Sequence, residues 1–141
     1  MPNEIQAKTT SGSFTISFGG TTAAASVESS LLSNANKAPA ALIFVTIRSG
    51  ASAPTAGGVY RIYLMRSDGT TQDNITNANI IGTIVVTNNA TTDFKKSFST
   101  DTLGPLGDSW GIIVENDTDQ TVDATDGNHD FTFQYVVPEV Q

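Results

Sequence analysis

The sequence lacks cysteine and contains a single histidine, His129, and these two shortages exclude several kinds of chemistry. Without thiols the chain has no disulfide, no thiolate metal site and no cysteine nucleophile. With one histidine, any serine nucleophile has a single candidate base. The composition therefore favours a binding or structural protein, and we expect neither enzymatic activity nor a cofactor.

Long apolar runs are also missing. No segment approaches the roughly 18 consecutive apolar residues that cross a bilayer as a helix. The first residues, 1–4, lack the basic segment and apolar core of an export signal. We expect a soluble protein that is not exported by the usual route and has no membrane partner.

Basic residues are absent after residue 100. The net charge is −7, and residues 101–141 hold nine acidic side chains, whereas residues 1–100 hold seven basic and five acidic ones. Binding to phosphates needs clustered Lys and Arg. We therefore expect no nucleic-acid partner, and we predict one neutral-to-basic face and one acidic face.

What the sequence has in quantity is short alternating segments separated by turn residues. Threonine, which favours strands, occurs 20 times. Segment 22–33 also fits a helical stripe, but its serine content favours strand or irregular structure. About eight strands at regular spacing predict an all-β fold, an antiparallel β-sandwich of jelly-roll type. The expected strands are 13–18, 22–33, 40–48, 59–66, 80–87, 93–100, 110–115 and 129–137.

The N-terminal segment differs from the rest of the chain. Residues 1–12 are polar, with Ile5 as the one large apolar side chain between the ends, and they finish in a Thr-Thr-Ser-Gly run. This composition predicts a flexible arm over 1–12, followed by a single β-sandwich domain over 13–141.

The acidic region 115–128 has two interpretations. Its Asp and Asn side chains resemble the oxygen ligands of Ca²⁺, but the twelve-residue loop with Gly at its sixth position and Glu at its last is not present. Asp and Asn also favour turns, so a solvated loop is the preferred interpretation and calcium stays open as the alternative. His129 is interpreted as a hydrogen-bonded residue beside this turn.

Trp110 opens an apolar strand, which favours core packing over stacking on a sugar. Segments 40–47 and 59–66 are apolar on both faces. Either a loop covers their outer face or they lie in a contact between subunits.

Five segments of the chain resemble small structural proteins of tailed bacteriophages, among them capsid decoration (cement) proteins of jelly-roll form. The similarity covers most of the chain, and its motifs are fold and loop signatures. The segments are Pro39–Arg48, Pro54–Tyr60, Ile81–Asn88, Leu103–Gly107 with Trp110–Ile112, and Gly127–Gln141.

The resemblance implies a virion protein made in the host cytoplasm. It would bind the major capsid protein outside the mature head, at subunit junctions, as a homotrimer. As hypotheses, Ile5 and Lys8 belong to a capsid-binding arm, and Arg61, Tyr63 and Met65 line the contact between copies. The alternative is a carbohydrate-binding or receptor-binding module of a phage tail or head fibre.

Overall fold

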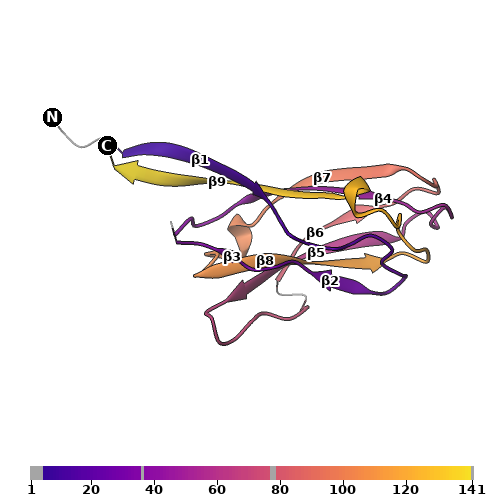
Figure 1. The fold of residues 1–141 in the computed structure, drawn as a ribbon, viewed down its shortest axis with the longest axis horizontal. Coiled ribbons are helices and arrows are strands. Elements are labelled where there is room, and N and C mark those ends of the chain that lie inside the picture. Colours follow the sequence, from indigo (N-terminus) through magenta and orange to yellow (C-terminus); the bar gives the residue numbers. More distant parts are fainter. Residues whose placement is uncertain (1–4, 36, 77–78, 141) are drawn as a thin grey trace.

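Two antiparallel sheets pack face to face (Figure 1). The computed structural model describes residues 5–35, 37–76 and 79–140, with side chains described from 9 to 135 within those ranges. Sheet A has the order β1-β9-β4-β7, and sheet B has the order β2-β8-β5-β6 with β3 also on β8. The strands are β1 Ile5–Ser13, β2 Ser26–Glu28, β3 Leu32–Ser33, β4 Leu42–Arg48, β5 Val59–Ser67, β6 Ile80–Val85, β7 Asp93–Ser99, β8 Ser109–Asp117 and β9 Asp130–Val140.

The strand pairs are nested along the chain. β1 pairs with β9, β2 and β3 pair with β8, β4 pairs with β7, and β5 pairs with β6. A long hairpin rolled over itself produces this nesting, which is the jelly-roll arrangement. The predicted all-β jelly-roll sandwich is confirmed. It has nine strands, because segment 22–33 supplies two short strands and β1 stands in place of the strand expected at 13–18.

The core lies between the sheets and follows the alternation of the strands. On β4, Ile43, Val45 and Ile47 are at most 2% exposed, while the residues between them face outward. Trp110 is fully buried and packs edge-on against Phe14 and Phe133, with ring centroids 5.2 and 5.3 Å apart. The predicted core position of Trp110 is therefore confirmed.

The first strand differs from the prediction. Segment 13–18 was expected to be a strand, but 14–18 crosses from sheet A to sheet B. The N–H of Phe14 still bonds to Phe131 in sheet A, at 2.9 Å, whereas the oxygen of Thr15 accepts the N–H of Ser30, at 2.8 Å. The alternation still predicts which side chains are buried, because a crossing segment also packs one face against the core.

Residues 5–12, expected to belong to a flexible arm, lie in β1 and pair with β9. The partners of β4 on β9 end at Gln134. Residues 5–10 and 135–140 therefore pair only with each other, and we call them the terminal ribbon. Figure 1 shows this ribbon projecting from the sandwich, with Ile5 paired to Val140 at its outer end.

Tyr60 gives the fold a dependence on alkaline pH. Its side chain is 1% exposed, and burial raises its pKa to about 12 from the ordinary 10.0. The unfolded chain ionises this phenol near pH 10 and the folded chain does not, so stability is present below pH 10 and falls as pH rises toward 12. We expect Tyr60→Phe to lose less stability between pH 9 and 11.5 than the wild type, by on the order of 2 kcal/mol, in urea unfolding. Equal losses in the two proteins would contradict this assignment.

Candidate binding surface

The outward-facing side of sheet A forms a polar face, which we call the outer face. Alternate residues of each strand point away from the core, so the four strands contribute one set of side chains to it. Small hydroxyl residues dominate the set, and most members are exposed. The described members between the ends of the face are Thr9, Ser11, Ser13, Leu42, Phe44, Thr46, Lys95, Ser97, Ser99, Asp130, Thr132 and Gln134.

Two large apolar side chains stand in this polar setting. Leu42 is 45% exposed and Phe44 is 41% exposed, and both project from β4. Each borders a hollow of the same face: one beside Phe44 is lined by Ser11, Ser13 and Thr132, and one beside Leu42 also reaches the root of the terminal ribbon. The adjacent exposed apolar side chains and the two hollows make this face the candidate contact surface.

The predicted contact residues between copies occupy a different place. Tyr63 and Met65 lie on the far face of sheet B and form a small buried cluster with Ile113, with exposures of 4% and 1%. The amide of Gln72, in the loop after β5, donates to the sulfur of Met65 at 2.8 Å. A loop therefore covers this face, and the two side chains leave little area for a second copy.

Arg61, the third predicted contact residue, is bound within the chain. Its guanidinium lies 2.5 Å from Asp117 and 3.3 Å from Glu115, and the hydroxyl of Tyr63 donates to Glu115 at 2.8 Å. Burial and Glu115 raise the pKa of Tyr63. This group joins β5 to β8 across sheet B.

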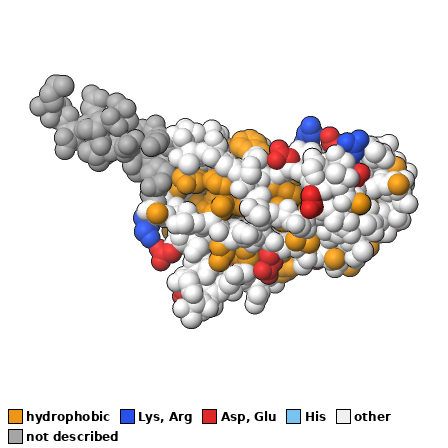
Figure 2. Space-filling view, in the orientation of Figure 1, with side chains coloured by type: hydrophobic (Ala, Val, Ile, Leu, Met, Phe, Trp, Pro, Cys, Tyr) orange, Lys and Arg blue, Asp and Glu red, His pale blue; other side chains and the backbone are white. Residues whose placement is uncertain are grey.

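Folding offsets part of the separation of charge along the sequence. Arg61 pairs with Glu115 and Asp117, and Lys37 pairs with Asp108. Folding thus brings basic residues from the first hundred against acidic residues from the last segment. Figure 2 shows red and blue side chains side by side at both ends of the visible face.

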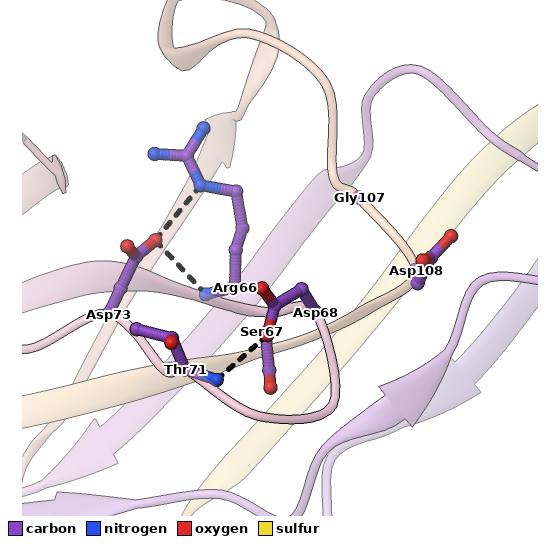
Figure 3. Close-up of a pocket in the computed structure, with 7 residues that line it drawn as sticks. All are labelled: Arg66, Ser67, Asp68, Thr71, Asp73, Gly107 and Asp108. Carbon is purple, nitrogen blue, oxygen red and sulfur yellow. Dashed lines mark hydrogen bonds and ion pairs between the residues drawn. The ribbon is translucent and has the colours of Figure 1, made fainter.

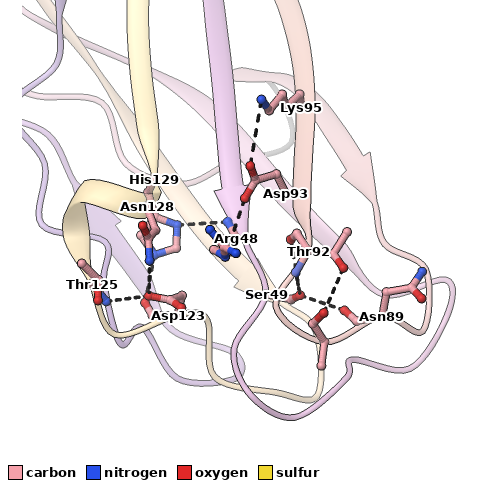
Figure 4. Close-up of polar contacts among 11 residues, drawn as sticks. Arg48, Ser49, Asn89, Thr92, Asp93, Lys95, Asp123, Thr125, Asn128 and His129 are labelled. Carbon is pink, nitrogen blue, oxygen red and sulfur yellow. Dashed lines mark hydrogen bonds and ion pairs between the residues drawn. The ribbon is translucent and has the colours of Figure 1, made fainter.

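His129 is held at both ring nitrogens (Figure 4). The N–H of Arg48 donates to Nδ1 at 3.2 Å, and Nε2 lies 2.9 Å from the carbonyl oxygen of Asp123. Because Nδ1 accepts, the proton belongs on Nε2, which donates to that carbonyl. The ring is 8% exposed and meets Phe18 edge-on at 5.5 Å. The expected hydrogen-bonded histidine is confirmed, and it connects β4 to the loop before β9.

Replacing His129 with alanine leaves the part-buried N–H of Arg48 without this acceptor. We expect a loss of about 1–3 kcal/mol in the free energy of unfolding, measured by urea titration. Asparagine places an oxygen near the position of Nδ1, so His129→Asn should recover part of the loss. Equal losses for the two variants would show that ring packing, not the hydrogen bond, is responsible.

The acidic loop uses its carboxylates to fix backbone. Asp119 accepts from the hydroxyl and the N–H of Thr55, at 2.6 and 2.8 Å, and these bonds lower its pKa. Asp123 accepts from the N–H of Thr125 and the amide of Asn128, which lowers its pKa too. Asp126 accepts from the N–H of Gly19. Within the described ranges, no three His, Asp or Glu side chains are grouped to hold a metal ion.

A third hollow, which is polar, lies between the loop after β5 and the loop before β8 (Figure 3). Arg66 dominates it, and its Nε lies 3.0 Å from Asp73 while Nη1 donates to the oxygen of Leu103 at 2.8 Å. Asp68 accepts the N–H groups of Thr70 and Thr71. The bonds of Arg66 and Asp68 hold the loop after β5 in place. The described side chains that line this hollow therefore serve the structure of the loop.

The exposure of the eleven aromatic side chains tests the alternative that the protein binds sugars. All of them are described, and among them only Phe44 is classed as exposed, at 41%. Sugar sites typically use several exposed aromatic rings around one cleft. The described residues show no cluster of exposed rings of that kind.

Comparison with known proteins adds no assignment. No protein-family model matches the chain, and no curated protein matches it. The described residues also contain no helix long and apolar enough to span a membrane.

Proposed function

We propose that this protein is a virion structural protein, a capsid decoration protein that binds the major capsid protein on the outside of the mature phage head. The observation that carries the proposal is the outer face of sheet A, with Leu42 and Phe44 exposed side by side and the terminal ribbon continuing from its edge. A stable core behind this face supports a role in binding.

The physical basis is binding at several points. A protein that contacts neighbouring capsid subunits gains affinity from each additional contact, but only when the subunits have the spacing that all contacts need. Binding to the mature spacing stabilises that state of the shell by mass action. The outer face and the projecting ribbon would provide two contact regions on one chain.

The ribbon contains the residues predicted for the capsid-binding arm. Ile5 lies opposite Val140, and Lys8 lies opposite Val137, in the part of β1 that projects beyond β4. We propose that this part touches the shell while remaining paired with β9. The position outside the body of the sandwich gives it access to a second capsid subunit.

Co-sedimentation with undecorated mature capsids tests the proposal. The wild type should pellet with capsids in saturable amounts, and Ile5→Ser with Lys8→Glu should weaken binding about tenfold or more. Point variants are preferable to deletion of residues 2–12, because the deletion also removes β1 from sheet A. Wild-type protein that stays in the supernatant at every concentration would refute decoration. Full binding by the double variant would refute only the role of the ribbon.

A further inference from the structure

β1 has an open edge whose orientation follows from one hydrogen bond. The N–H of Phe14 donates to the oxygen of Phe131, at 2.9 Å, in the register of the β1–β9 pair. Hydrogen-bonded pairs alternate along an antiparallel ladder, so the even-numbered residues of β1 bond to β9. The odd-numbered residues turn their N–H and C=O groups to the open edge, and they are Ile5, Ala7, Thr9, Ser11 and Ser13.

The opposite edge of the ribbon is blocked. By the same alternation, even-numbered residues of β9 face away from β1, and beyond β4 these include Pro138, opposite Ala7. Proline has no N–H, so this edge lacks a donor in the middle of the ribbon. An open chain of ribbons would pair the β1 edge of one copy with the β9 edge of the next. The β9 edge is interrupted by Pro138, so only the β1 edge is suitable for pairing.

The remaining sheet edges in the described part of the chain are short, irregular or charged. β2 and β3 have three and two residues, and the pairing of β6 is irregular beside Tyr63. β7 carries Lys95 and Lys96, and Lys96 reaches across to the oxygen of Thr83 at 3.0 Å. Such features protect edges from pairing. β1 is nine residues long and regular, and although it carries Lys8, its residues 9–13 are uncharged Thr, Ser and Gly.

We propose that β1 pairs with β1 of a second copy, antiparallel and about a two-fold axis. A register centred on Thr9 pairs all residues from 5 to 13 and sets Lys8 opposite Thr10 of the other copy, so the two Lys8 positions do not coincide. It forms about ten backbone hydrogen bonds between chains, the number in a typical protein interface. A self-paired edge is closed, so the assembly stops at two copies.

The pairing explains why a two-stranded ribbon extends beyond the sandwich. Two strands alone are marginally stable in water, and three or more are needed for a stable sheet. Joining two ribbons edge to edge gives a sheet of four strands. Sheet A of one copy then continues into sheet A of the other, and their outer faces lie on the same side. Leu42 and Phe44 from both copies would form one wide contact face. This two-fold assembly differs from the homotrimer that the sequence resemblance implies.

The mass of the purified full-length protein in solution tests the pairing without capsids. We expect twice 14.8 kDa by light scattering for the wild type. Ser11→Pro removes an open-edge N–H and leaves the β9 ladder intact, so it should weaken the dimer about 100-fold. Ser97→Pro is the matched control. The N–H of Thr100 bonds to the oxygen of Ala41 in β4, so the even-numbered residues of β7 bond to β4 and the odd-numbered ones, Ser97 among them, face the free edge. This control should remain dimeric.

A single cysteine tests the register, because the chain has no other. Thr9→Cys places two thiols opposite each other across the axis, within reach of a disulfide, and should form a cross-linked dimer at least tenfold faster than Ser97→Cys. The proposal is overturned if the wild type is a monomer or a trimer. It is also overturned if the two proline variants dimerise equally, or if the two cysteine variants cross-link equally. If the protein is a monomer, the open edge of β1 would be available to pair with a strand of another protein.

Discussion

Replacing Trp110 with alanine is expected to lower the free energy of unfolding by about 3–5 kcal/mol, the largest change of any single substitution considered for this chain. The indole is fully buried and packs against Phe14 from the crossing segment and Phe133 from β9. Its removal opens a cavity where sheet A, sheet B and the crossing segment meet, and the surrounding strands cannot close it.

Urea unfolding followed by far-ultraviolet circular dichroism measures this loss, since the chain has no other tryptophan to report by fluorescence. Val85→Ala is the control, because Val85 is 61% exposed and should change stability by less than about 0.5 kcal/mol. A loss below 1 kcal/mol for Trp110→Ala would mean that the two sheets do not depend on this contact.

Changing Leu42 and Phe44 together to serine is expected to reduce capsid binding at least 100-fold while changing stability little. Both side chains are more than 40% exposed, so the folded chain does not depend on them, whereas apolar anchors at the centre of an interface dominate its affinity. The amount of protein that sediments with mature capsids, titrated over concentration, measures the effect.

Val85→Ser provides the matched control for that experiment. Val85 is more exposed than either residue but lies on β6, in the other sheet. It should bind as the wild type does. If the control loses as much affinity as the double variant, or if the double variant binds normally, the outer face of sheet A is not the contact surface.

The sequence predicted the fold through the alternation of its strands. Ile43, Val45 and Ile47 are buried at the positions that a period of two assigns, and the turn residues between strands end each element. Alternation reports which face is buried and not which strand is the partner. For that reason segment 14–18, which packs two phenylalanines inward, was expected to be a strand although it crosses between sheets.

The position of β1 could not be predicted from local composition. Its polar Thr-Thr-Ser-Gly run reads as a loop, and it forms a strand because β9, more than a hundred residues later, presents a ladder to it. Gly12 contributes to this fit, since a Cβ there would lie 2.8 Å from the ring of Phe133. Pairing over such a separation leaves no local signal in the sequence.

The predicted surface residues show the same limit. The two-faced pattern of segment 59–66 correctly predicted that its outer side is covered, but it could not choose between a loop and a second copy. The structure buries Met65 under Gln72. In segment 40–47 the same pattern has the opposite outcome, because no described loop covers Phe44, and the outer face of sheet A becomes the candidate surface.

Binding to capsids before and after expansion tests the central claim most directly. Purified protein is titrated against undecorated mature shells and against unexpanded shells, and the bound copies per shell are counted after sedimentation. Decoration predicts saturable binding to mature shells at a fixed number of sites and at least tenfold weaker binding to unexpanded shells, because the contacts require the mature spacing. Equal binding to both shells, or binding to neither, would contradict it.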